Sequence, residues 1–419
     1  MPRKTNKKTE EKETVAPQVA TPNVTAFLDM TEDVGFSAIG STDTSNVADY
    51  LPTFLPSIDL IMGGGIPFKR FSEVYGAEKA GKSTFMLHLT EIASMLGVPT
   101  VWIDTEGTTG EDRFNDFNID KRYVKHFVPE KLGKGNILSI EKVDEIIETM
   151  MDKYISNPTM DNVPVLCIWD GVAGTISEEE ANTAMEDEGR RGRQASAVTK
   201  LVKRVAPKLV NCNMSVVVTN QVRANMDGMA FSKKEKRAAN VKALEHAESV
   251  RLEIKATKPT KGMTAISRGV VDNGGNNKTG AIVNFTADKS KDGVSSQSTQ
   301  YEVYSSNVIS RDPYINLQGL DFSSCLFTDA LGANIIKKAG AYYKFITKNG
   351  EVITKHKDEL LTEFHENDEL LQDLFEQTLV FYFPHRYPAM NNRNIDITKF
   401  KYWSDTLTEK YKGVTTGDL

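Results

Sequence analysis

The sequence predicts an α/β fold with a mostly parallel central sheet, and three observations support this prediction. Apolar, strand-like segments alternate with helix-like segments over residues 51–254, a pattern typical of parallel sheets whose faces are covered. A glycine-rich phosphate-binding motif at residues 76–84 joins one such strand to the helix that follows it. Several later strands end in a carboxylate or an amide, at the sheet edge where ligand sites of this fold class lie.

The phosphate-binding motif follows the pattern G-x-x-x-x-G-K-[S/T] and consists of Gly76, Ala77, Glu78, Lys79, Ala80, Gly81, Lys82, Ser83 and Thr84. The backbone N–H groups of such a loop cradle phosphate oxygens. We expect Lys82 to reach the β- and γ-phosphates of a nucleotide and Ser83 to bind Mg²⁺. A chance match to the pattern is the alternative. The flanks argue against it, because a strand pattern precedes the motif at residues 70–75 and an amphipathic helix pattern follows at residues 85–96.

Apolar periodicity places the elements that follow the motif. Strands are expected at residues 99–106, 163–170, 214–221, 250–254 and 281–285, and helices at residues 140–154 and 193–210. The glycines at residues 63–65 predict a turn before the motif, and the polar residues 259–280 predict a long hairpin or loop.

Three polar side chains at the ends of these strands are candidates for the chemistry. Asp170 is expected to be the acidic partner of Mg²⁺, directly or through water. Glu106 is expected to activate or orient the attacking water, although a surface glutamate without a role is the alternative. Asp104 could instead be the acid that faces the metal. The amide of Gln221 can donate to a phosphate oxygen and accept from water, which suits a sensor of the γ-phosphate.

Two charged loops are candidates for binding single-stranded DNA. Loop 2, residues 222–240, follows Gln221 directly, and its basic and aromatic composition suits phosphates and stacked bases. Loop 1, residues 177–193, is acidic first and basic afterwards, so only its arginines are expected near DNA. A solvated charged loop is the alternative for each, but the connection to Gln221 would let nucleotide order loop 2. The candidate DNA contacts are Arg190, Arg191, Arg193, Arg223, Phe231, Lys233, Lys234, Lys236 and Arg237.

Composition excludes several classes of protein. The chain has 419 residues, 39% hydrophobic and 26% charged, which is typical of globular proteins. It has no apolar run of the ~20 residues that span a bilayer and no apolar N-terminal signal segment. Three cysteines without metal-ligand spacing indicate a reducing cytoplasm and argue against a disulfide framework or a zinc site. Because the net charge is −6, contacts with nucleic acid must rest on local basic patches.

Changes in composition divide the chain into five parts. The N-terminal tail mixes charge with Thr and Pro and is expected to be disordered. The C-terminal module is expected to hold helices at residues 327–338 and 358–379 around an aromatic strand at residues 339–345. The expected parts are a basic tail (1–23), a lead-in or oligomerisation segment (24–50), the α/β core (51–315), a small α+β domain (316–410) and a tail (411–419).

Over roughly residues 55–348 the chain resembles the RecA recombinases, including the phage UvsX-type members. The motifs that carry the resemblance are IDLIMGGGIP (58–67), EVYGAEKAGKST (73–84), WIDTE (102–106), IWD (168–170), TNQVR (219–223), SVRLEI (249–254) and KKAGAYY (337–343). The resemblance implies a RecA-like P-loop ATPase core that uses ATP and Mg²⁺. In these terms Asp170 is the Walker B acid, Glu106 the catalytic carboxylate and Gln221 the γ-phosphate sensor.

The resemblance also implies a site shared between protomers, since the family binds ATP between neighbours. Lys289 and Lys291 occupy the place of two lysines that reach across the interface, although exposed lysines in a turn are the alternative. Where an aromatic residue lies near adenine in bacterial RecA, this chain has Arg113 with Phe114 beside it, and either could stack on the base. His246 stands at the place of an interface aromatic, with a buried neutral histidine as the alternative.

The implied function is an ATP-dependent recombinase that forms a helical filament on single-stranded DNA and exchanges strands with double-stranded DNA. Implied partners are further copies of the chain, a single-strand-binding protein and mediator proteins, in the cytoplasm of a bacterium or a phage-infected cell. A RecA-core hexameric helicase or a paralogue that modulates a recombinase is the alternative. The complete set of Lys82, Glu106 and Asp170 argues against a non-catalytic paralogue.

Overall fold

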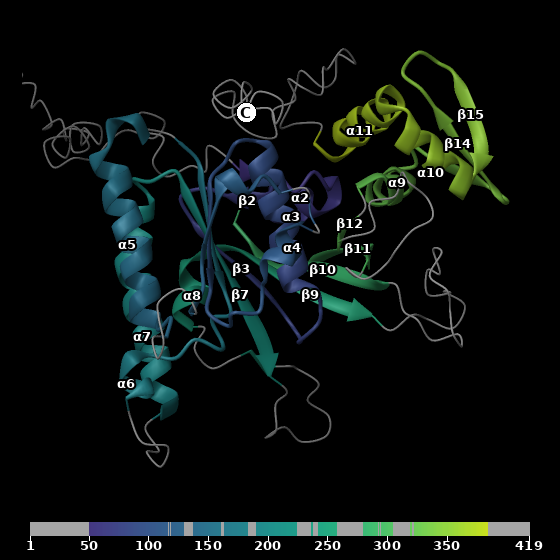
Figure 1. Ribbon diagram of the computed structural model, residues 1–419. Coiled ribbons are helices and arrows are strands. Elements are labelled where there is room, and N and C mark those ends of the chain that lie inside the picture. Colours follow the sequence, from purple (N-terminus) through teal and green to yellow (C-terminus); the bar gives the residue numbers. More distant parts are fainter. Residues whose placement is uncertain are drawn as a thin grey trace, which may run out of the picture. The chain divides into compact units, whose positions relative to one another are not determined.

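A computed structural model gives the structure of the chain (Figure 1). It describes residues 50–115, 117, 119–129, 137–160, 163–182, 190–223, 236–237, 242–257, 280–291, 293, 295–304, 319–320 and 322–383. The expected tail at 1–23, the lead-in segment before residue 50, the polar loop at 259–280 and the tail at 411–419 lie outside these residues. None of the helices in the described part of the chain is both long and apolar enough to cross a membrane.

The main sheet contains ten strands among the described residues, in the order β12-β11-β10-β9-β3-β7-β6-β4-β5, with β8 paired to β7. Six neighbouring strands, from β9 to β5, run parallel, and β10, β11 and β12 continue the sheet antiparallel. The predicted mostly parallel sheet is therefore confirmed. The strands are β3 (Phe71–Gly76), β4 (Thr100–Asp104), β5 (Val124–Phe127), β6 (Val165–Asp170), β7 (Met214–Arg223), β8 (Lys236–Arg237), β9 (Glu248–Thr257), β10 (Gly280–Ser290), β11 (Gln297–Tyr304) and β12 (Gly319–Leu320). Before them, β1 (Tyr50–Leu51) pairs with β2 (Ile66–Pro67).

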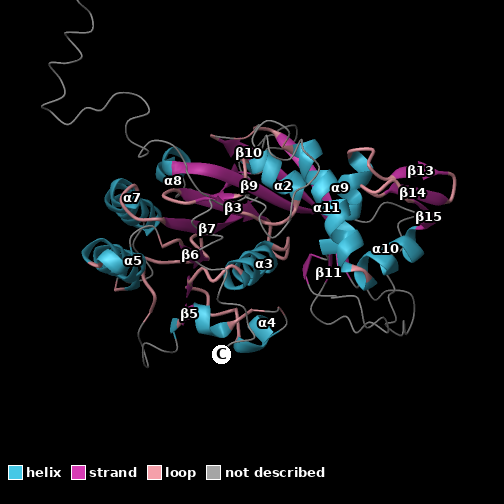
Figure 2. Ribbon diagram, turned by 90° about the horizontal axis from the view of Figure 1, so that it is seen from above, coloured by secondary structure: helices cyan, strands magenta, loops and turns pink. Residues whose placement is uncertain are grey.

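Helices cover the two faces of this sheet (Figure 2). Along β7, Val217 packs into the apolar cluster that contains α2 and α3, whereas Val216 and Val218 pack into the cluster that contains α5, α7 and α8. This alternation follows the two-residue period of a strand and makes a buried three-layer structure. The helices of this part are α2 (Pro56–Met62), α3 (Lys82–Met95), α4 (Glu111–Asn115), α5 (Ile140–Ser156), α6 (Glu178–Ala181), α7 (Arg190–Leu209) and α8 (Lys242–Ala247), with 3-10 turns at Lys121–Tyr123 and Pro158–Met160.

The C-terminal elements differ in detail from the sequence prediction. The helix expected at 327–338 is α9 (Phe322–Gly332), and the residues after it form a hairpin instead of one strand. The long helix expected at 358–379 is broken at Asn367, whose side chain accepts a hydrogen bond from Leu370 N (3.1 Å) and so begins a second helix. The elements are β13 (Lys337–Ala339), β14 (Tyr342–Ile346), β15 (Val352–His356), α10 (Lys357–Glu366) and α11 (Asp368–Tyr382).

A buried polar cluster joins α2, β11 and α9. The Asp329 carboxylate accepts hydrogen bonds from Ser57 N (3.1 Å), Ser57 Oγ (2.8 Å) and the Tyr301 hydroxyl (2.7 Å). Burial raises the pKa of Asp329 to about 6, although these hydrogen bonds oppose the rise. The division of the chain at residue 316 stays a prediction, but α9 packs against the α/β core through this cluster.

We predict that Asp329 makes folding less favourable as the pH rises. Its pKa in the folded protein lies above that of an unfolded aspartate (~3.9), so the folded state binds the proton more tightly. The contribution of Asp329 to the free energy of unfolding is therefore largest below pH ~4. It declines by on the order of 2 kcal/mol as the pH rises through about 6. Urea unfolding of wild type and Asp329→Asn from pH 4 to 7 should show the difference in unfolding free energy changing in this direction. If the unfolding free energies of the two proteins changed in parallel with pH, the prediction would be contradicted.

Candidate active site

The phosphate-binding motif occupies the turn between β3 and α3. β3 ends at Gly76 and α3 begins at Lys82, so the helix N-terminus opens onto the loop. A Cβ atom at Gly76 would lie 2.1 Å from the backbone oxygen of Ile254 on β9, and this close approach requires glycine. The expected strand, loop and helix are thus present.

Lys82 lies over the loop that it belongs to. Its Nζ atom donates to the backbone oxygens of Gly76 (3.1 Å) and Ala77 (2.8 Å). Burial lowers the pKa of Lys82, and the negative charges of Asp170 and Glu106 oppose this shift. The three side chains expected to share one site therefore act on one another electrostatically.

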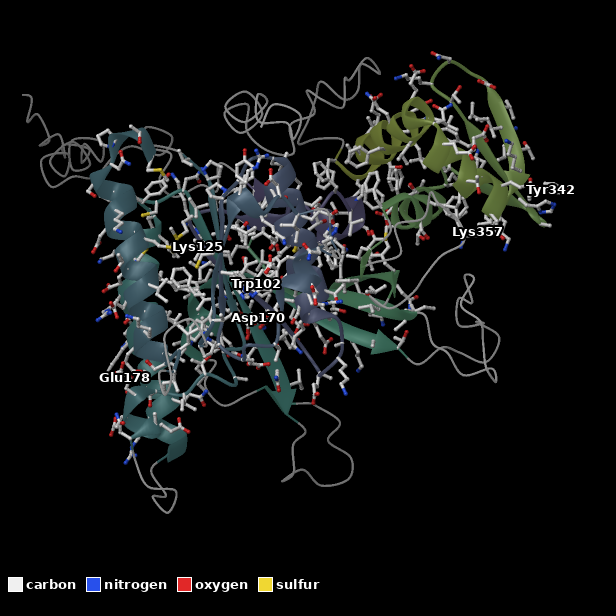
Figure 3. All side chains as sticks on the ribbon, in the orientation of Figure 1. Trp102, Lys125, Asp170, Glu178, Tyr342 and Lys357 are labelled. Atoms are coloured by element: carbon white, nitrogen blue, oxygen red, sulfur yellow. The ribbon has the colours of Figure 1, made fainter. Side chains whose placement is uncertain are left out.

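Asp170 lies at the end of β6, within the α/β core (Figure 3), and its carboxylate is buried. Its Oδ1 atom accepts a hydrogen bond from Thr219 Oγ1 (2.6 Å), whereas Oδ2 has no hydrogen-bond partner among the described residues. Burial raises the pKa of Asp170 to about 6, with further contributions from the charges of Asp104 and Glu106, while the hydroxyls of Thr219 and Ser83 oppose the rise.

This environment fits a divalent cation. Asp170 Oδ2 and the nearby Ser83 hydroxyl are both oxygen donors, and Mg²⁺ prefers oxygen ligands. In the described part of the chain no three His, Cys, Asp or Glu side chains gather as a metal cluster. Mg²⁺ that is bound with a nucleotide usually takes several of its ligands from phosphate and water.

Asp104 has a structural part in the site, and the alternative that it faces the metal stays a prediction. Its two carboxylate oxygens accept hydrogen bonds from Gly107 N and Thr109 N, at 2.8 Å each. Burial alone would raise the pKa of Asp104, but the nearby His126 ring, whose Nε2 atom lies 3.8 Å from Oδ2, and the hydrogen bonds from the backbone of Thr109 and Gly107 outweigh it and lower the pKa. Asp104 is therefore ionised at neutral pH and shapes the loop that carries Glu106.

Glu106 lies against a glycine turn, which we define as residues 171–175, directly after β6. A Cβ atom at Gly171 would be 2.7 Å from Glu106 Cγ, and one at Gly174 would be 3.0 Å from Glu106 Oε1. Gly171 also has a φ of 100°, which L side chains rarely adopt. The turn therefore leaves room for Glu106 only because both positions lack a side chain.

Gln221 contacts Glu106. Its Nε2 atom donates to Glu106 Oε1 at 3.2 Å. The register of the parallel strands explains the contact, because Gly76 pairs with Gln221 and Asp104 pairs with Asp170. The phosphate loop, the candidate metal acid, the candidate water-activating acid and the candidate sensor thus meet at one edge of the sheet.

Comparisons with known proteins agree with this arrangement. Residues 33–271, more than half of the chain, match the family described as the RecA N-terminal domain. The chain belongs to the RecA family. It is 26% identical over 341 residues to Protein RecA of Petrotoga mobilis, with 80% of each chain covered. Protein RecA of Thermotoga sp. strain RQ2 is 24% identical, covering 75% of this chain and 77% of its own. Protein RecA of Ureaplasma parvum is also 24% identical, covering 77% of this chain and 84% of its own.

A buried polar network extends from the candidate sensor of this RecA-family chain across three strands. Asn220 accepts from Gln221 N (2.9 Å) and donates to Glu73 Oε1 on β3 (2.8 Å). Arg251 on β9 lies 3.9 Å from Glu73 Oε2 and pairs with Glu248 (3.1 Å). Sequence reasoning missed Asn220 and Glu73, although a charged residue inside an apolar strand is a signal that a buried partner exists.

The two candidate trans lysines lie at the end of β10. Lys289 is half-buried and donates from Nζ to the backbone oxygen of Glu245, whereas the Lys291 side chain is exposed. Burial lowers the pKa of Lys289, and the negative charge of Glu248 opposes this shift. Their action on a neighbouring protomer stays a prediction.

His246 on α8 is exposed, so the alternative of a buried neutral histidine is wrong.

Of the two candidates for stacking on the base, only Arg113 keeps a partly exposed side chain. Phe114 is buried, and its ring lies 5.3 Å from that of Trp102 and 5.1 Å from that of His126. The prediction that Phe114 could stack on adenine is therefore wrong, because its ring belongs to the apolar core.

The structure describes only part of the predicted DNA contacts. Phe231, Lys233 and Lys234 lie outside the described residues, as do the side chains of Arg190, Arg191, Arg223, Lys236 and Arg237. Arg223 ends β7 and pairs with Lys236 of β8, so the base of loop 2 is a two-stranded ladder. Arg190, Arg191 and Arg193 belong to the first turn of α7, and Arg193 Nε lies 3.2 Å from Glu179 Oε1.

We predict that Asp104→Asn destabilises the folded chain by about 1–3 kcal/mol at pH 7, because one of the two backbone N–H donors at this buried carboxylate loses its acceptor. Since the pKa of Asp104 is lowered in the folded state, the loss should shrink as the pH falls below ~4. Urea unfolding measures both effects, with Asp112→Asn, an exposed acid on α4, as the matched control. Equal stability of the two variants would refute the structural role.

Proposed function

We propose that this chain is an ATP-dependent recombinase whose ATP hydrolysis is stimulated by single-stranded DNA. The hydrogen bond between Gln221 Nε2 and Glu106 Oε1 carries the proposal. It joins the candidate γ-phosphate sensor to the candidate water-activating carboxylate, and β7 runs from Gln221 directly into the ladder at the base of loop 2. A DNA-induced change at loop 2 has a short covalent path to the site of hydrolysis.

The residues around the loop divide the work as follows. Lys82 and the backbone of the phosphate loop hold the phosphates, and Ser83 and Asp170 hold Mg²⁺. Mg²⁺, when bound, neutralises charge on the phosphate oxygens. Glu106 orients the attacking water, and Gln221 orients Glu106 according to the presence of the γ-phosphate. Arg113 is the remaining candidate for contact with the base.

The proposal includes a filament in which each ATP is shared between neighbours. Lys289 and Lys291 would act on the phosphates bound by the next protomer, which makes hydrolysis conditional on assembly. Loops 1 and 2 would bind single-stranded DNA and pair it with double-stranded DNA. In this proposal the protein acts on DNA in the cytoplasm of a bacterium or a phage-infected cell. Its partners there would be single-strand-binding and mediator proteins.

We predict that single-stranded DNA raises the ATPase rate of the wild type at least tenfold and that Glu106→Gln abolishes most of this rate. Loss of a group that acts in proton transfer typically costs about 10²–10⁴-fold. Binding of ATP and DNA should survive in Glu106→Gln, because the side chain keeps its size. Glu111→Gln, an exposed acid on α4, is the matched control and should hydrolyse like the wild type. Turnover independent of DNA would sink the recombinase proposal.

A mixing experiment tests the shared site. Glu106→Gln and the double variant Lys289→Ala, Lys291→Ala should each be inactive alone with DNA. Mixed in equal amounts, they should recover roughly a quarter of the wild-type rate, because random neighbours restore both halves of some interfaces. Absence of any recovery would show that the lysines act within their own chain or not at all.

Electron microscopy on single-stranded DNA with a slowly hydrolysed ATP analogue separates the recombinase from a ring-shaped motor. We expect helical filaments, and a strand-exchange assay with homologous double-stranded DNA should yield joint molecules that heterologous DNA does not. Closed rings without joint molecules would instead favour the helicase alternative.

A further inference from the structure

Gln194 connects helix α7 to the glycine turn. Its Nε2 atom donates to Thr175 O at 2.7 Å and lies 3.3 Å from both Val172 O and Ala173 O. The side chain is partly buried and comes from the first turns of α7. One amide group therefore holds three of the five residues of the turn by their backbone.

The turn that Gln194 holds is the surface against which Glu106 lies. A Cβ added at Gly171 or Gly174 would come within 3.0 Å of Glu106 atoms, so the exposed Glu106 side chain lies over the backbone of the turn, in space that only glycine leaves open. In such a contact, a shift of the turn must move the side chain that it touches or open space beside it. The place of the Glu106 carboxylate thus depends on the place of the turn.

We infer that Gln194 is a positioning residue for ATP hydrolysis, which fixes the glycine turn and thereby holds Glu106 where it orients the attacking water. The inference rests on the proposed function, because it requires Glu106 to act on that water. No hydrogen bond joins Gln194 to Glu106 among the described residues, so Gln194 acts through the backbone of the turn.

The chemistry of the side chain suits this part. Three carbonyl oxygens close together present partial negative charge, and the amide of glutamine offers two N–H donors to them without a net charge. Methionine has a similar length and no donor, whereas lysine has enough reach and three donors. Gln194→Met therefore removes the hydrogen bonds while it keeps the size of the side chain, and Gln194→Lys tests whether another donor can replace the amide.

Gln194 also lies next to a predicted DNA contact. Arg193 precedes it in α7 and pairs with Glu179 of α6, within loop 1. A DNA phosphate that binds Arg193 competes with Glu179 for it and acts on the same end of α7 that holds the glycine turn. Loop 1 would then be connected to Glu106 through Gln194 and the glycine turn, as loop 2 is connected to it through Gln221.

The test compares the full-length wild type with Gln194→Met and Gln194→Lys. We expect Gln194→Met to lower kcat for ATP about 10- to 100-fold, the effect of misplacing a catalytic group by about 1 Å. KM and equilibrium ATP affinity should stay within about twofold, and Gln194→Lys should restore most of kcat. Unchanged kcat in Gln194→Met would overturn the inference. So would an equal loss of kcat, ATP affinity and thermal stability in both variants, because that indicates a merely structural residue.

A double variant locates the effect. In a Glu106→Gln background, Gln194→Met should lower the residual kcat less than about twofold, because Gln194 acts through Glu106. A further tenfold loss there would overturn the inference. Rates are measured with and without a single-stranded oligonucleotide. If the wild-type rate does not respond to DNA, the proposed function fails, but the DNA-independent rates of Gln194→Met and Gln194→Lys still decide the role of Gln194.

Discussion

The register of the parallel strands is the constraint on which the site depends. Pairing of Gly76 with Gln221, and of Asp104 with Asp170, brings the carboxyl ends of four strands to one edge. A slip of one residue would exchange the side chains that face the two helical layers, because the period of a strand is two. β7 is buried on both faces, with Val217 in one apolar cluster and Val216 and Val218 in the other. The pairing of the strands therefore sets the distance between Gln221 and Glu106.

The two buried aspartates of this edge have opposite properties because their hydrogen bonds differ. Asp104 receives backbone N–H groups on both oxygens, which lowers its pKa and makes it part of the framework. Burial raises the pKa of Asp170 to about 6, because the hydroxyl of Thr219 on Oδ1 does not offset it and Oδ2 has no hydrogen-bond partner among the described residues. An unsatisfied buried carboxylate is costly unless a cation or another donor joins it. The number of hydrogen bonds, and not the residue type, thus distinguishes the framework acid from the acid that can bind a ligand.

Local signals predicted the sheet, the phosphate loop and the strand-end residues Glu106, Asp170 and Gln221, because each belongs to a short motif with its own periodicity or spacing. The glycine turn and Gln194 were not predictable, since their part is defined by contacts with Glu106 and with backbone far away in the sequence. Phe114 was misassigned for the same reason: an aromatic residue beside a site and one in the core have the same local pattern. Strand β11 was missed because its sequence, QSTQYEVY, is largely polar.

Helix α2 packs against both the sheet and the C-terminal helices, and this limits where the chain can be shortened. One hydrophobic cluster contains Leu55 beside α2, Phe285 of the sheet and Leu374 of α11. The rings of Phe54 and Phe375 lie 6.2 Å apart, edge to face. A fragment that ended at β12 would expose this apolar surface and leave Ser57 and Tyr301 without the Asp329 carboxylate. A soluble shorter form of the nucleotide-binding part would therefore have to retain α9 to α11 or carry polar replacements on α2.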